Sequence, residues 1–141
     1  MRWLVLVLAA CNPKTPADLP PNTASAFGVR VHAPSDVKVQ QTARYAHVGN
    51  GTFKLNLFAV DQYSPTSAAD QKARIERDLG VVKLTREDAG ATTWRFDYEL
   101  SNGHAATVAR ITPGRPLDCG VYDVAPEIAA AVAAACATAS P

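Results

Sequence analysis

The sequence predicts an α+β domain with an antiparallel sheet of about 5–7 strands and two helices, at about residues 67–79 and 126–138. Two Asn-Gly pairs each lie between runs of alternating hydrophobicity, which is the strongest short-range signal of a β-hairpin. The two helical patterns are separated from these hairpins and do not alternate with single strands. This segregation excludes a doubly wound parallel sheet.

The first expected strand starts near Ala26, and apolar and polar side chains alternate as far as His32. The turn residues Pro34-Ser35-Asp36 end it. Val37 and Val39 alternate again and predict a short edge strand.

Segments 42–48 and 52–60 flank Asn50-Gly51, which predicts a two-residue type I′ turn because both of its central residues need positive φ. That register pairs Val48 with Phe53 and Ala46 with Leu55. The opposite face of the hairpin then carries Tyr45, His47, Lys54 and Asn56.

Ser67 and Asp70 have the spacing of a helix N-cap and an acidic third residue. The helix is expected to run from about Ala68 to Leu79, with Gly80 as its C′ residue. Its thin apolar stripe comprises Ala68, Ile75 and Leu79.

Strands are expected at residues 81–86, 93–100 and 105–112, and Asn102-Gly103 joins the last two in a two-residue turn. The expected register pairs Leu100 with Ala105, Tyr98 with Thr107, Phe96 with Ala109, Trp94 with Ile111 and Arg95 with Arg110.

The last strand is expected at residues 117–122, followed by a helix that starts at Pro126 and runs to about residue 138. Apolar residues recur every fourth position, which turns Cys136 toward the sheet. The order of elements over residues 26–139 is similar to the Mog1/PsbP-like layout, in which helices come before and after the middle strands of an antiparallel sheet. The similarity is topological and involves no motif, and a cystatin-like arrangement is the alternative.

The first eleven residues contain one arginine, a short apolar run and the sequence Leu8-Ala9-Ala10-Cys11. This pattern resembles the lipobox of bacterial lipoproteins. The resemblance implies that residues 1–10 are a signal peptide that is removed, and that Cys11 receives a diacylglyceryl group and an acyl chain such as palmitate. A buried strand is an alternative, whereas a transmembrane helix would need about 20 apolar residues.

Residues 11–25 follow as the lipidated cysteine and a proline-rich tether, and the single domain is expected at residues 26–141. Two or more acyl chains hold a protein stably on a membrane. By analogy with enteric lipoproteins, Asn12 after the cysteine predicts the outer membrane, with the domain facing the periplasm.

The charge is nearly balanced, with 14 Lys and Arg against 13 Asp and Glu, and loss of Arg2 makes it 13 against 13. A neutral domain has no electrostatic basis for binding nucleic acid. No cofactor or metal site is expected, since no ligand set has the required spacing.

Once Cys11 is assigned to lipid, Cys119 and Cys136 remain as a pair for an oxidising compartment. A disulfide between them would close a loop worth roughly 3 kcal/mol. Two buried free thiols are the alternative.

Catalytic motifs are scarce. Ser35 to Lys38 matches the Ser-x-x-Lys acyl-transfer pattern but lies before alternating valines, where a turn serine is expected. Tyr45, Phe58 and Tyr63 lie away from the apolar face of the first hairpin, so that either a helix covers them or they form an exposed partner surface. We expect a non-enzymatic module that binds another envelope protein. The alternatives are a small-ligand binder with a pocket between sheet and helix, and a hydrolase.

Overall fold

Seven antiparallel strands form the main sheet in this computed structural model, which describes residues 22–141. Their order is β3-β4-β5-β9-β8-β7-β6, and β1 and β2 form a separate two-stranded sheet. The predicted α+β class is therefore confirmed. The strands are β1 (Asn22–Ala26), β2 (Val29–Ala33), β3 (Lys38–Gln41), β4 (Tyr45–Gly49), β5 (Lys54–Ala59), β6 (Val81–Ala89), β7 (Trp94–Leu100), β8 (Ala105–Ile111) and β9 (Leu117–Val124), and the helices are α2 (Ala68–Glu76) and α3 (Pro126–Ala137).

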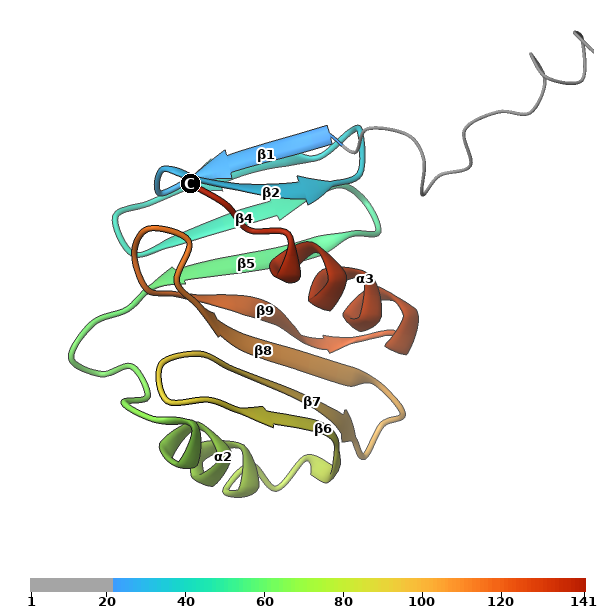
Figure 1. The fold of residues 1–141 in the computed structure, drawn as a ribbon. Coiled ribbons are helices and arrows are strands. Elements are labelled where there is room, and N and C mark those ends of the chain that lie inside the picture. Colours follow the sequence, from blue (N-terminus) through green and yellow to red (C-terminus); the bar gives the residue numbers. More distant parts are fainter. Residues whose placement is uncertain (1–21) are drawn as a thin grey trace, which may run out of the picture.

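The two helices lie on opposite faces of the sheet and over different strands (Figure 1). Helix α3 packs on β8, β9, β5 and β2, and it encloses the larger core around Leu55, Leu57 and Val132. Helix α2 lies beside β6 and encloses a smaller core around Phe96 and Ile75. Each helix consequently covers only part of its face.

The folded region begins earlier than expected, because β1 occupies residues 22–26, of which 22–25 were assigned to the tether. Its partner is β2, and the two are joined by Phe27 and Gly28 with φ of 55° and 71°, as a type I′ turn requires. Its buried residues, Ala24 and Ala26, are small, so their alternation with Thr23 and Ser25 is a weak strand signal in the sequence. The lipobox and the earlier part of the tether lie outside the described residues.

The first hairpin has a four-residue loop where a two-residue turn was predicted. The Asn50 side chain accepts hydrogen bonds from the backbone N–H of Thr52 at 2.8 Å and of Phe53 at 2.7 Å, which stabilises the wider loop. Val48 therefore pairs with Leu55, and Ala46 pairs with Leu57. A shift of two residues keeps each side chain on its predicted face.

The second hairpin differs by one residue, and the consequence is larger. Its loop has three residues and ends in Gly103 at φ 84°, the conformation of a type I turn followed by a bulge. Phe96 then pairs with Val108, and Trp94 pairs with Arg110. A one-residue shift turns every side chain of β8 to the other face, so the predicted pairing of Arg95 with Arg110 is wrong.

Helix α2 starts as predicted, with the Ser67 side chain accepting a hydrogen bond from the Asp70 N–H at 3.0 Å. It ends at Glu76, before the predicted end at Leu79. Leu79 is fully exposed and is not part of the apolar stripe, whereas Ile75 is buried. The chain turns at Asp78 and continues directly into β6.

The Cys119–Cys136 disulfide is present and joins β9 to α3, with a Cα–Cα distance of 5.9 Å. Both cysteines are buried in the larger core. The helical periodicity that turned Cys136 toward the sheet predicted this pair correctly. The disulfide attaches the C-terminal helix to the centre of the sheet.

Candidate docking surface

Two areas of the sheet have no helix over them, because α2 and α3 cover different strands on opposite faces. On the α3 side, β6 and β7 are uncovered. On the α2 side, β3, β4, β5 and β9 are uncovered. We call the first area the charged face (Lys83, Arg86, Asp88, Arg95, Asp97 and Glu99) and the second the aromatic face (Tyr45, His47, Asn56, Phe58 and Tyr122).

Opposite charges alternate on the charged face, and its side chains pair with one another. Arg95 donates to Asp97 at 2.7 Å, and the Thr107 hydroxyl donates to the same carboxylate at 2.6 Å. Lys83 lies 3.8 Å from Glu99. Such a ladder of exposed ion pairs is an ordinary way to keep a sheet face in contact with water.

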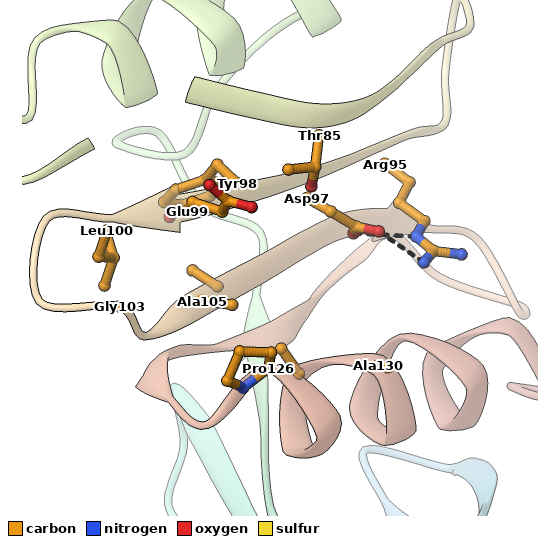
Figure 2. A pocket seen from close by; sticks show the side chains of 12 residues that line it. Thr85, Arg95, Asp97, Tyr98, Glu99, Leu100, Gly103, Ala105, Pro126 and Ala130 are labelled. Carbon is orange, nitrogen blue, oxygen red and sulfur yellow. Dashed lines mark hydrogen bonds and ion pairs between the residues drawn. The ribbon is translucent and has the colours of Figure 1, made fainter. Parts of the chain in front are cut away.

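A groove of about 470 Å³ separates the charged face from α3 (Figure 2). Arg95, Asp97 and Glu99 line its strand side, and Pro126 and Ala130 come from the helix opposite. The charged side chains are neutralised within the protein, by one another or by Lys83. This pairing gives no specific support to the small-ligand alternative, which needs converging polar groups that remain available.

Apart from Tyr122, the residues of the aromatic face lie in two rows of side chains that run across the strands of the sheet. In the first row, Tyr45 pairs with Phe58, and the row continues through Asp118 and Arg110 to Trp94. The second row contains Gln40, His47, Asn56 and Gly120.

Tyr45 and Phe58 are exposed by 37% and 47%, and their ring centroids lie 6.4 Å apart. The ring of His47 contacts Tyr45 edge-on at 5.0 Å, and its Nδ1 is hydrogen-bonded to the Asn56 side chain. No helix packs over this pair among the described residues, since α2 lies over β6 and β7. Of the two alternatives, cover by a helix or exposure to solvent, the structure shows Tyr45 and Phe58 exposed.

Tyr63 lies apart from this pair, in the loop between β5 and α2, and is 71% exposed. Its backbone carbonyl accepts a hydrogen bond from Arg74 at 2.7 Å. The structure thus brings Tyr45 and Phe58 together, but it records no ring contact between either of them and Tyr63 within residues 22–141.

Tyr122 is an aromatic residue that the sequence reasoning missed. It is 52% exposed, its ring lies 6.5 Å from that of Tyr98, and its hydroxyl donates to Asp78 at 2.8 Å. These bonds keep the pKa of Tyr122 above its ordinary value, chiefly through the Asp78 carboxylate. The sequence contains a signal for its position, because Tyr122 and Gly120 alternate with Cys119 and Val121 and so lie on the face opposite the cysteine.

The inner end of the first row is buried and charged. Arg110 donates to Asp118 at 2.5 and 3.2 Å and to the Pro65 carbonyl at 2.8 Å. Its guanidinium also lies 4.5 Å from the centroid of the Trp94 ring. The loop that carries Tyr63 is therefore attached to the sheet by a hydrogen bond from the buried Arg110 to the Pro65 carbonyl.

The three histidines are on separate parts of the domain, and within the described residues one of them, His104, pairs with a carboxylate at a hairpin tip. His104 Nδ1 lies 2.7 Å from Asp123, whose carboxylate also accepts from Asn102 at 2.8 Å. The hydrogen bond from the Asn102 amide has the largest effect on Asp123 and lowers the pKa of its carboxyl, and the hydrogen bond with His104 lowers it further. Both members of the pair are about half exposed, and no three potential metal ligands cluster within residues 22–141.

Comparison with protein-family models, with curated proteins and with solved structures finds no match. The lipoprotein and Mog1/PsbP-like resemblances therefore stay predictions from the sequence.

Proposed function

We propose that this protein is a small lipid-anchored component of the bacterial envelope, held by acyl chains on Cys11, and that its domain is a non-enzymatic module that binds another envelope protein. The aromatic face is the proposed binding surface. The domain would face the periplasm, on the outer membrane.

The observation that carries this proposal is the difference between the two uncovered areas. The charged face has the ion pairs expected of a surface that meets only water. The aromatic face instead exposes Tyr45, Phe58 and Tyr122 on neighbouring strands. Tyrosine and phenylalanine are enriched in protein interfaces, and exposed apolar patches mark such sites.

The proposed anchor rests on the sequence alone. Cys11 follows an apolar run and two alanines, and a proline-rich segment separates it from the first strand. In the described part of the chain, neither helix has the length and hydrophobicity needed to cross a bilayer. Acyl chains on Cys11 would supply the membrane attachment.

Site-specific photo-crosslinking in intact cells tests the binding surface. A photoreactive amino acid at Gln40, which is exposed beside His47 on β3, should crosslink to one protein. The same probe at Thr85, exposed at the charged face, is the matched control and should not crosslink to it.

The double substitution Tyr45→Ser and Phe58→Ser should abolish the Gln40 crosslink without lowering the amount of folded protein. An identical crosslinking pattern from Gln40 and Thr85, or a Gln40 crosslink that survives the double substitution, would show that the aromatic face is not the binding surface.

A further inference from the structure

The aromatic face has two cations at one end, although the chain as a whole is nearly neutral. Segment 34–60 contains Lys38, Arg44 and Lys54 but a single carboxylate, Asp36. Lys38 and Lys54 both pair with Gly49 and so lie at one end of the face. Arg44 precedes Tyr45 opposite Ala59, and the alternation along the strand turns its side chain to the other face of the sheet.

Lys38 and Lys54 are exposed, and among the described residues neither of them forms an ion pair. By contrast, every cation within α2, β6 and β7 lies within 4.0 Å of a carboxylate. The paired set is Lys72, Arg74, Lys83, Arg86 and Arg95.

We propose that the aromatic face binds an acidic segment of a protein partner, an inference that rests on the proposed function. An apolar side chain of that segment packs on Tyr45 and Phe58, and its carboxylates pair with Lys38 and Lys54. Complementary charges at the rim of an interface speed association and exclude partners of the wrong sign.

The shape beside His47 favours a protein segment over a membrane surface. One hollow of about 430 Å³ is lined by Lys38, Gln40 and His47, and a second of about 310 Å³ by His47, Lys54 and Tyr122. Asp123 also lines the second, where its carboxylate accepts a hydrogen bond from Asn102 at 2.8 Å and lies 2.7 Å from His104 Nδ1. Projecting side chains of a protein can fill two such hollows. Asp36 also lines the first, where its carboxylate accepts a hydrogen bond from Asn50 at 2.9 Å.

Fluorescence anisotropy with synthetic peptides tests the proposal. The probes are a peptide that alternates glutamate with leucine and phenylalanine, the same peptide with every glutamate replaced by lysine, and a version with serine at every apolar position. Only the first should bind well. Lys38→Gln with Lys54→Gln should weaken its binding about fivefold, as expected for two exposed ion pairs.

Arg77→Gln with Arg115→Gln is the matched control, since it removes the same charge from two exposed arginines outside this face and should leave binding unchanged. The proposal is overturned if the lysine peptide binds equally well, or if the control pair weakens binding as much as the lysine pair. It also fails if the domain binds vesicles of phosphatidylglycerol and phosphatidylethanolamine through Lys38 and Lys54 but binds no peptide. In each of these cases a persistent crosslink from Gln40 would leave the proposed function standing, whereas loss of that crosslink as well would remove both.

Discussion

Arg110 illustrates how much one position depends on the register of its strand. Its guanidinium is buried between the Asp118 carboxylate, the Pro65 carbonyl and the face of Trp94. These partners compensate for the loss of hydration that burial of a charge entails. The pair therefore belongs to the core, although a charged residue in a strand would ordinarily be assigned to the surface.

Removal of one partner of this pair should be strongly destabilising. Arg110→Met leaves the buried Asp118 carboxylate without its cation, which we expect to lower the free energy of unfolding by about 3–5 kcal/mol. Urea denaturation measures the change. The double variant Arg110→Met with Asp118→Leu should recover most of the loss, and equal losses in the single and double variants would contradict this account.

Tyr98 links stability to alkaline pH. Burial is the main reason that the pKa of the Tyr98 phenol is raised to about 12, and the nearby Tyr122 and Asp78 raise it further. In the unfolded chain the phenol ionises near pH 10. Its stabilising effect is thus fully present below pH 10 and is lost as the pH rises from 10 to 12, because the unfolded state loses its proton first.

Over that interval we expect the free energy of unfolding to fall by about 2–3 kcal/mol. Urea denaturation at a series of pH values measures this change. Tyr98→Phe should reduce the slope. The exposed Tyr63→Phe is the control and should keep the wild-type slope, so equal slopes for Tyr98→Phe and the wild type would contradict the prediction.

At the scale of elements, β9 connects the two halves of the domain. It pairs with β5 on one side and β8 on the other, and its Cys119 is bonded to Cys136 of α3. Alternate residues of β9 contribute to the larger core on one face and to the buried ion pair on the other. Substitutions in this strand should therefore affect both cores.

The disulfide should account for a considerable part of the stability. It joins residues 17 apart, and a loop of that length is worth about 3 kcal/mol. We expect Cys119→Ala with Cys136→Ala to lower the free energy of unfolding by that amount, and reductant to act similarly on the wild type. Reductant should leave the double variant unchanged. Intact mass should rise by two hydrogen atoms on reduction of the wild type, and an unchanged mass would show that the thiols are free.

At Gly120 the backbones of β9 and β8 approach closely. A Cβ added there would overlap the Thr107 carbonyl oxygen and crowd the Val108 backbone. We expect Gly120→Ala to destabilise by about 1–3 kcal/mol in urea denaturation. Gly51→Ala, in a loop where an added Cβ meets no atom within 4 Å, is the matched control and should be close to neutral. Similar effects of the two substitutions would contradict the proposed close approach.

At the scale of the molecule, the two helices are placed diagonally, which leaves two unlike surfaces. One is balanced in charge, and the other combines aromatic rings with two lysines that form no ion pair within residues 22–141.

The anchor has its own test. Cys11→Ser should leave the precursor uncleaved and without acyl chains, because only the thiol accepts the diacylglyceryl group in the family that the lipobox resembles. Cell fractionation with mass spectrometry of the N-terminus checks this. A wild-type protein that is soluble and carries residues 1–10 without any acyl mass would contradict it.

Much of the fold could be predicted from local patterns. The alternation in Trp94 to Leu100 and the spacing of Ile128, Val132 and Cys136 each placed an element and its buried face correctly, and the cap at Ser67 placed the start of α2. These signals depend on neighbours within one strand or one helical turn, so the sequence contains them in full.

The register of the second hairpin and the exposure of Tyr45 and Phe58 required the tertiary structure. Asn102-Gly103 is compatible with a two-residue or a three-residue loop, and one residue decides whether Arg110 meets water or Trp94. Whether a helix covers an aromatic pair depends on which strands it crosses, and that depends on the packing of side chains far apart in the chain. The sequence by itself thus determined the cysteine pair and the elements other than β1, whereas long-range packing decided which faces are exposed and hence where a partner would bind.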